Sequence, residues 1–194
     1  MVARARARGE LRRFRLAVFR DGGPPQYLDF RTARHPSESP QHLVARVLAF
    51  GLEARPGLAL RFRAGGVSTG DEPALAARTA GGALRLAVEI GSPDSRRLAR
   101  LRRRAAEVVV YCHRDPRPLR RALARMEARG ARIRVHLLPA EFVEGLAASL
   151  EGDNRWEIEV AGDTLEVTRR PVGGSEPPAS LAGRMAPLEL PAPG

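Results

Sequence analysis

The sequence predicts a single α/β domain built on a mixed β-sheet, and three observations lead to this prediction. Segments in which apolar and polar residues alternate lie near both ends of the chain, and they predict a β-hairpin at each end. Between the hairpins, three strand-like segments alternate with two amphipathic helical segments from about residue 83 to residue 138. The chain has 194 residues, 43% of them hydrophobic, which is enough for one core but short for two.

The N-terminal hairpin is predicted from residues 12–20 and 27–33, where apolar and polar residues alternate on either side of a turn-forming Asp-Gly-Gly-Pro-Pro segment at 21–25. A helix is expected next, because Ser37 or Ser39 can act as its N-cap and a proline is tolerated in the first turn. Its apolar stripe consists of Leu43, Val44, Val47 and Leu48. A stripe with this spacing is typical of a helix with a buried face.

Three strands are expected in the centre of the chain, at 83–90, 108–112 and 133–137. After the first strand, Ser-Pro-Asp at 92–94 combines an N-cap, a proline for the first turn and an acid for the helix dipole. After the second strand, Asp-Pro at 115–116 opens another helix. Two successive strand–helix–strand units place the three strands parallel, so a parallel βαβαβ core is predicted within the mixed sheet.

The C-terminal hairpin is predicted from residues 156–167, which alternate on both sides of a Gly-Asp turn. Residues 171–194 are rich in Pro, Gly and Ser with little periodicity, which predicts a disordered tail. Residues 1–11 are expected to be a basic N-terminal tail. The folded domain is therefore expected to span residues 12–170.

The chain carries a formal net charge of +11 and contains no lysine, so arginine supplies its cationic side chains apart from histidine. Clustered cations bind phosphates and release counterions, which favours nucleic acid or another polyanion as a partner. The alternative is a solvated surface in a protein of arginine-rich composition. An aromatic content of 5% weighs against platforms that stack bases.

Compartment is indicated by what the sequence lacks. No apolar run approaches the roughly 20 residues that a membrane-spanning helix needs, and the arginine-rich start is not followed by the apolar stretch of a secretory signal. Cys112 is the single cysteine, and the spacing of His42, His113 and His136 is not typical of a metal site. These features predict a soluble protein without a membrane partner, located in the reducing cytoplasm.

Three segments carry a resemblance to a known family. They are Ala-Arg-His-Pro-Ser-Glu at 33–38, Asp-Glu-Pro at 71–73, and Glu-Ile-Gly-Ser-Pro-Asp at 89–94, the last followed by Arg96 and Arg97. In their order, spacing and context the chain resembles the YaeQ family over about residues 10–170. The resemblance implies a compact version of the PD-(D/E)XK nuclease fold.

The resemblance also implies a metal site. Asp71 and Glu89 are expected to hold Mg²⁺, with Glu72 as the alternative to Asp71, and Glu38 is expected to position the attacking water. Mg²⁺ prefers oxygen ligands and keeps several waters, so a few carboxylates hold it while positions remain for a phosphate oxygen and a water.

The nuclease motif also contains a lysine two residues after the second acid, and here that position is Gly91. The matching basic residues lie on the following helix, where Arg97 and Arg100 are expected to stabilise phosphate charge. Arginine keeps its proton, with a pKa above about 12, and is a poor general base. This departure weighs against hydrolysis.

The same helix carries a basic stripe opposite Leu98 and Leu101, and we expect the stripe to contact a phosphate backbone. The residues assigned to this contact are Arg96, Arg103 and Arg104. The alternative is a solvated face. Glu89 has an alternative as an exposed acid paired with Arg85, and Asp94 is expected to serve the helix dipole.

Three functional hypotheses follow. The first is an Mg²⁺-binding, nuclease-like protein that acts on nucleic-acid phosphodiesters. The second is a catalytically inactive module that binds nucleic acid or a transcription-linked protein partner. The third is a domain that only scaffolds a protein complex.

Overall fold

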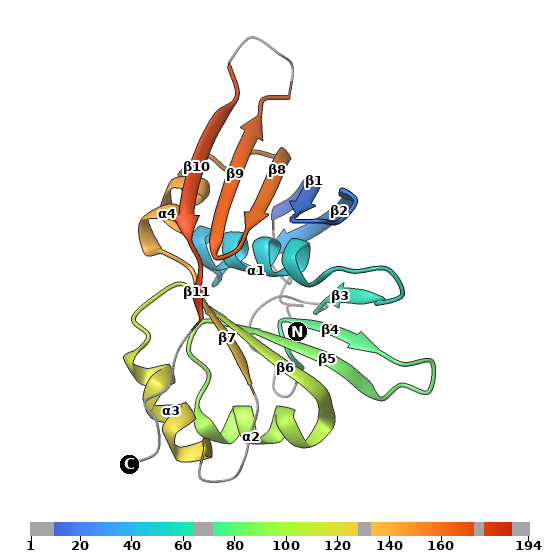
Figure 1. Ribbon diagram of the computed structural model, residues 1–194, viewed down its shortest axis with the longest axis vertical. Coiled ribbons are helices and arrows are strands. Elements are labelled where there is room, and N and C mark those ends of the chain that lie inside the picture. The colour runs from blue at the N-terminus through green and yellow to red at the C-terminus, as the bar shows by residue number, and fades with distance from the viewer. Residues whose placement is uncertain (1–9, 64–71, 128–132, 173–176, 188–194) are drawn as a thin grey trace, which may run out of the picture.

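The computed structural model describes residues 10–63, 72–127, 133–172 and 177–187, and within these ranges the chain forms two β-sheets and four helices (Figure 1). Sheet A has the order β10-β9-β8-β1-β2 and consists of β1 (Glu10–Arg20), β2 (Gln26–Arg34), β8 (Asp153–Ala161), β9 (Thr164–Arg170) and β10 (Ala179–Arg184). Sheet B has the order β11-β7-β6-β5-β4-β3 and consists of β3 (Leu60–Phe62), β4 (Leu75–Arg78), β5 (Leu84–Ile90), β6 (Ala105–Cys112), β7 (Arg134–Leu137) and β11 (Ala186–Pro187). The helices are α1 (Pro40–Glu53), α2 (Ser95–Arg104), α3 (Arg117–Glu127) and α4 (Ala140–Ala148). The expected single mixed sheet is therefore two mixed sheets.

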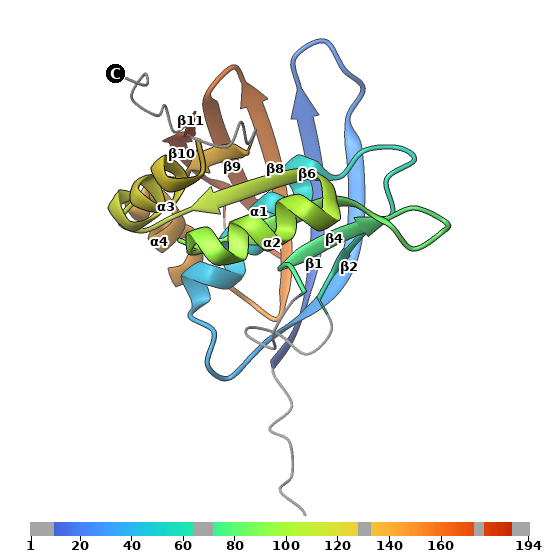
Figure 2. The same cartoon turned by 90° about the horizontal axis from the view of Figure 1, so that it is seen from below.

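Helix α1 lies between the two sheets, and α2 and α3 cover the outer face of sheet B (Figures 1 and 2). Every residue of α1 from Leu43 to Ala49 is buried, including Arg46. A helix that is covered on all sides belongs in the middle of a core rather than on its surface. Helix α4 packs beside α1 and β10. The layers are thus sheet A, α1 with α4, sheet B, and the outer pair α2 and α3.

The core between the sheets is built from the alternating residues of the two hairpins. Phe14, Leu16 and Val18 of β1 are at most 2% exposed, and they pack with Trp156 and Ile158 of β8. β1 pairs with β2 antiparallel, as β8 does with β9, so both predicted hairpins are confirmed. β1 also pairs with β8 in parallel, with Leu16 opposite Trp156, and this contact joins the two hairpins into sheet A.

Strands β5, β6 and β7 run parallel, which confirms the predicted βαβαβ core. β6 is buried on both faces. Val109 and Tyr111 join the core around α1, whereas Val110 and Cys112 join the separate core under α2 and α3. The unbroken apolar run of this strand is the pattern expected of a parallel strand with helices on both sides.

The expectation of a disordered tail at residues 171–194 is wrong for its described part, because β10 pairs antiparallel with β9 along its whole length. Backbone pairing holds this strand, and its side chains bury little surface, so the usual hydrophobic signal is weak. A close approach also fixes it: a Cβ at Gly183 would lie 2.8 Å from Cγ of Phe142 on α4, so glycine is required. At the other end β1 already begins at Glu10, and residues 1–9 of the expected basic tail lie outside the described residues.

The described helices include none with both the length and the apolar composition needed to cross a membrane.

Candidate functional site

Glu89 lies near the carboxyl end of β5 and is only 6% exposed. Its side chain faces α2, where Arg97 binds both carboxylate oxygens: Nε donates to Oε2 at 3.0 Å and Nη2 donates to Oε1 at 2.8 Å. This two-point pairing is the strong geometry for guanidinium and carboxylate. The alternative interpretation of Glu89 as an exposed acid paired with Arg85 is therefore wrong.

The local sequence between β5 and α2 positions Arg97. Gly91 adopts φ of 93°, a left-handed conformation that glycine reaches without strain, and it turns the chain out of the strand. Asp94 then caps α2, with Oδ1 accepting from the backbone N–H of Arg97 at 2.7 Å. Leu98 and Leu101 bury the inner face of the helix. Asp94 lies at the helix start as expected, but it is itself the N-cap and α2 begins at Ser95, so the N-cap and first-turn proline expected at 92 and 93 are wrong.

Charge around Glu89 is dominated by arginine. Burial raises the pKa of Glu89, and the hydrogen bonds and charge of Arg97, followed by the charge of Arg63, lower it in part. Burial lowers the pKa of Arg63, while the negative charges of Glu89 and Glu38 raise it. The charge of Arg63 is thus coupled to the charges of both Glu38 and Glu89.

Glu38 lies just before α1 and is 3% exposed. Its Oε2 accepts from Arg46 Nη2 at 3.0 Å and from the backbone N–H of His35 at 3.1 Å, whereas Oε1 has no hydrogen-bond partner. Arg46 is buried too, and its guanidinium lies 5.4 Å from the ring centroid of Phe62. Burial raises the pKa of Glu38, against the lowering effect of Arg46. This acid is held in place by a buried ion pair.

The described acids do not fit Mg²⁺ in this arrangement. Both oxygens of Glu89 are occupied by Arg97, and one oxygen of Glu38 is occupied by Arg46. Over the ranges that the structure describes, no three acidic, histidine or cysteine side chains are grouped so that they can hold a metal ion. Asp71, the other expected ligand, lies outside the described residues. Glu72, its alternative, pairs with Arg78 at 3.0 Å on the surface.

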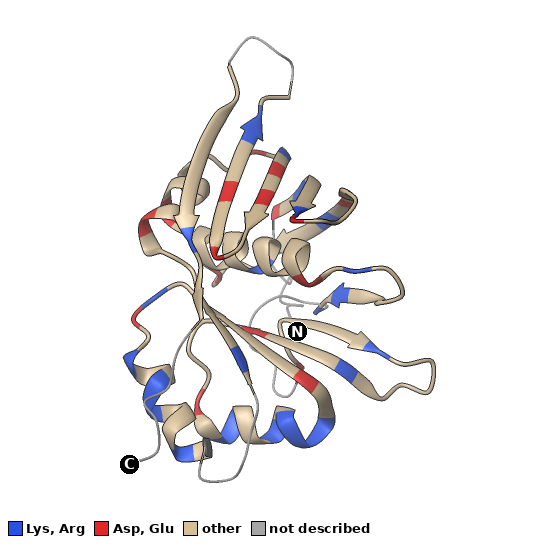
Figure 3. Ribbon diagram, viewed as in Figure 1, with Lys and Arg blue, Asp and Glu red and all other residues tan. Residues whose placement is uncertain are grey.

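The outer helices carry a dense set of arginines (Figure 3). Arg96, Arg103 and Arg104 are exposed on α2 as expected, and so is Arg100, one turn beyond Arg97. The neighbouring helix α3, which the sequence analysis does not include in the contact, adds the exposed residues Arg117, Arg120, Arg121 and Arg125. The signal was present in the sequence, because these arginines are spaced along α3 between the apolar residues that bury its other face. Together α2 and α3 contain ten arginines and one acidic residue.

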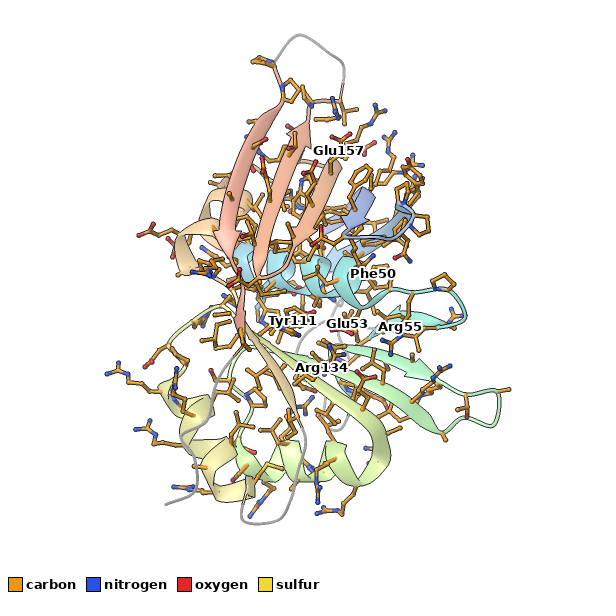
Figure 4. All side chains as sticks on the ribbon, viewed as in Figure 1. Phe50, Glu53, Arg55, Tyr111, Arg134 and Glu157 are labelled. Atoms are coloured by element: carbon orange, nitrogen blue, oxygen red, sulfur yellow. The ribbon has the colours of Figure 1, made fainter. Side chains whose placement is uncertain are left out.

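A second polar network, absent from the sequence predictions, lies between α1 and sheet B (Figure 4). The Tyr111 hydroxyl donates to Glu53 Oε1 at 2.9 Å, and Arg134 Nη2 donates to Glu53 Oε2 at 3.0 Å. Arg134 also pairs with Glu107, which accepts from Arg55 at 3.0 Å. The sequence signal for it is slight: one tyrosine in an otherwise apolar strand segment. The network ties the C-terminal end of α1 to sheet B.

The structure also brings together two histidines that the sequence separates. The rings of His42 on α1 and His113 after β6 meet edge to face, with 6.0 Å between their centroids. Residues 42 and 113 lie far apart in the sequence, and they meet because α1 packs against β6.

Comparison with known proteins relates the chain to a family. The family model described as "YaeQ protein" matches residues 21–172. A crystal structure of the YaeQ protein from Xanthomonas axonopodis pv. citri is similar at 27% sequence identity and a TM-score of 0.78, covering 94% of this chain and 99% of that one. The YaeQ protein from Pseudomonas syringae is similar at 22% identity and a TM-score of 0.81, covering 93% and 96%. No curated protein matches this chain.

Proposed function

The chain belongs to the YaeQ family, and we propose that it binds the phosphodiester backbone of nucleic acids through the arginines of α2 and α3. The observation that carries this proposal is the concentration of positive charge on the two outer helices, which contain ten arginines and one acidic residue (Figure 3). α2 itself contains no acid.

A polyanion suits such a surface for a physical reason. Each phosphate that pairs with a cation releases condensed counterions, so affinity grows with the number of contacts and falls as salt is added. Arginine in particular offers a planar fork of donors that matches phosphate oxygens. Arg97 forms an ion pair with the buried Glu89. Arg97 therefore has a structural role beneath this surface and is not expected to bind phosphate itself.

Metal-dependent hydrolysis in a PD-(D/E)XK-like site is the second candidate, and the grouping of the buried acids Glu38 and Glu89 near Arg63 is the observation that favours it. Mg²⁺ held by Asp71 and Glu89 would need Arg97 to release both oxygens of Glu89. Arginine also supplies no general base. Binding without hydrolysis is therefore the better supported function.

Fluorescence anisotropy with labelled single- and double-stranded DNA and RNA over a salt series tests the proposal. We expect binding that weakens steeply with salt, and a loss of about tenfold or more in the double variant Arg96→Gln/Arg103→Gln at low salt. The matched control is Arg31→Gln/Arg155→Gln, which removes the same charge from exposed positions on sheet A. Equal losses in both variants would contradict the assignment to α2. Absence of binding would favour a protein partner instead.

Cleavage assays with the same substrates and Mg²⁺ or Mn²⁺ separate the two candidates. We expect no cleavage above the level of Glu89→Gln. Metal-dependent cleavage that this variant abolishes would establish the second candidate.

A further inference from the structure

A pocket lies where the carboxyl ends of the parallel strands β5 and β6 meet the N-terminal end of α1. Its lining includes Glu38, Ser39, His42, Ser92, His113 and Arg114. The edge at the carboxyl ends of parallel strands is the usual position for ligands in α/β proteins. The pocket is separate from the exposed arginines proposed to bind nucleic acid, which project from the outer helices.

Two buried polar atoms in this lining lack partners. Oε1 of Glu38 and Nε2 of His113 accept or donate no hydrogen bond, although their residues are only 3% and 4% exposed. A third polar atom, Nε2 of His42, lies 4.0 Å from Oε1 of Glu38, which is too far for a hydrogen bond. Buried polar groups are nearly always satisfied, so unsatisfied groups gathered in one pocket indicate a missing partner.

A partner that carries positive charge and donates hydrogen bonds fits these acceptors. Glu38 has a carboxylate oxygen to offer, and carboxylates accept only. Burial, followed by neighbouring charges, lowers the pKa of His42 and of His113 to about 4, so both imidazoles are neutral near pH 7 and each has a nitrogen lone pair. Four arginines also lie near, and each donates to another acceptor. Arg46 pairs with Oε2 of Glu38 through Nη2, although its Nε has no acceptor. Arg34 donates to the Glu38 carbonyl, Arg63 to the Glu72 carbonyl and Arg114 to Ser39.

The spacing distinguishes an ammonium from a metal ion. Two donors that share a metal at about 2.1 Å lie roughly 3.0 to 3.4 Å apart. Two acceptors that share one N–H₃ group at about 2.9 Å lie roughly 4 to 4.7 Å apart. The separation between Glu38 Oε1 and His42 Nε2 is 4.0 Å, which is longer than the metal spacing and lies at the lower end of the ammonium range. In agreement, these side chains are not among any metal-holding group in the described ranges.

We propose that this pocket binds a primary ammonium group, with Glu38 Oε1 as its counter-charge and the Nε2 atoms of His42 and His113 as its other acceptors. A primary ammonium has three N–H donors, one for each acceptor. The Glu38 side chain is fully buried, whereas that of His42 is 22% exposed. Rotation of the His42 ring therefore gives the ammonium access to Glu38. The chain contains no lysine side chain to fill the pocket, and we consider two sources of the amine, a small molecule and a lysine of another protein.

Histidine nitrogen spectra of the full chain test this proposal, because the chain has only four histidines and each is assigned by a single substitution. Methylammonium is titrated against tetramethylammonium, which has the same charge but no N–H donor. We expect methylammonium to shift the His42 and His113 nitrogen resonances saturably, at concentrations at least tenfold lower than tetramethylammonium. Equal responses to the two cations, or no saturable shift, would overturn the proposal.

Substitutions assign the counter-charge. Glu38→Gln is expected to weaken methylammonium binding at least tenfold, and Glu141→Gln, which removes an exposed acid on α4, is expected to leave it unchanged. If Glu38→Gln loses its fold by circular dichroism, His113→Phe replaces it, with His42 as the reporter and the same loss expected. Unchanged binding in a folded Glu38→Gln or His113→Phe variant would refute the assignment.

Two larger probes identify the source of the amine. 1,4-Diaminobutane represents a free polyamine, and Nα-acetyl-lysine methylamide represents a lysine side chain on a protein. Tighter binding of the first supports a small-molecule ligand, and tighter binding of the second supports a protein ligand. Failure of both, when methylammonium also fails, refutes the site.

Discussion

The outer face of sheet A and the outer helical layer of α2 and α3 differ in how many acids accompany their arginines (Figure 3). On sheet A arginines stand beside acids: Arg13 pairs with Asp29, and Arg170 pairs with Glu157, each with a contact of 2.5 Å. On α2 and α3 the arginines outnumber the acids ten to one.

The difference teaches how to interpret an arginine-rich composition. Composition places arginine on every surface, but a surface becomes strongly basic only where acids are missing. Sheet A has its arginines largely neutralised by neighbouring carboxylates, so it presents little field to a polyanion. The net positive charge of the protein is therefore concentrated on α2 and α3, and we expect a polyanion to bind on that side.

The largest difference between the regions is expected in stability. Removing Arg97 in an Arg97→Ala variant leaves the carboxylate of Glu89 buried without its partner, which costs about 3 to 5 kcal/mol. Arg170→Ala breaks an exposed pair on sheet A, at a cost of about 1 kcal/mol or less. Urea unfolding followed by the fluorescence of the buried Trp156 measures both. Similar losses in the two variants would remove the distinction between buried and surface pairs.

A control isolates the cause. The double variant Glu89→Leu/Arg97→Met replaces the buried pair with apolar side chains of similar size, and it is expected to recover most of the stability lost in Arg97→Ala. If it does not, Arg97 supports the fold through its contact with the Glu72 carbonyl, which it reaches at 2.9 Å.

Lowering the pH should also reduce the stability of the folded protein, through the buried His113. His113 has a folded-state pKa of about 4 against 6.5, because it is buried. Between these values the unfolded chain binds a proton that the folded chain does not, so stability falls as pH is lowered from 6.5 to 4, by roughly 2 to 3 kcal/mol. The raised pKa values of Glu38 and Glu89 oppose this trend at the acid end of the window. Unfolding curves of wild type and His113→Phe should converge as pH falls, and parallel curves would contradict the assignment.

The α3 arginines give a third, smaller contrast. Arg121→Gln/Arg125→Gln is expected to weaken nucleic-acid binding by about three- to tenfold and to lower the salt slope by about 2, because each lost phosphate contact removes roughly 0.9. Anisotropy of the variant and of Arg31→Gln/Arg155→Gln measures this. An unchanged slope in the α3 variant would restrict the contact surface to α2.

The smallest expected effect is a gain in affinity for nucleic acid. If the carboxylates on sheet A neutralise its arginines, then the double variant Asp29→Asn/Glu157→Gln should release Arg13 and Arg170 from their ion pairs. The affinity for nucleic acid should then rise by a few-fold or less at low salt. The gain should vanish at high salt, where exposed charges are screened. No gain at any salt concentration would show that position on the fold matters more than pairing.

Much of the fold follows from sequence periodicity. The alternation around Phe14 and Trp156 predicts the two hairpins, and the order of strands and helices from residue 83 to 138 predicts the parallel core. Periodicity shows which face of a strand is buried but not which strand is its neighbour. The pairing of β1 with β8, in which Arg13 lies opposite Asp153, joins residues 140 positions apart, so the division into two sheets was not predictable.

The candidate site was only partly predictable for a related reason. The motif identifies Glu38 and Glu89 as unusual acids, and both are indeed buried together with arginines. Which arginine neutralises each acid depends on tertiary packing: Arg46 reaches Glu38 along α1, while Arg97 reaches Glu89 across from α2. The meeting of His42 with His113 likewise depends on how α1 crosses the sheet.

The parallel contact between β1 and β8 has a consequence for how the chain is made. The β1–β2 hairpin leaves the ribosome early with the apolar face of Phe14, Leu16 and Val18, but its parallel neighbour, starting at Asp153, is synthesised on the order of ten seconds later at typical elongation rates. The high contact order of sheet A also predicts slow closure. Nascent chains stalled before β8 should therefore expose the unpaired edge and apolar face of β1 and bind chaperones. The strands of the β5–β7 unit follow one another closely in the sequence, so this unit is expected to fold while translation continues.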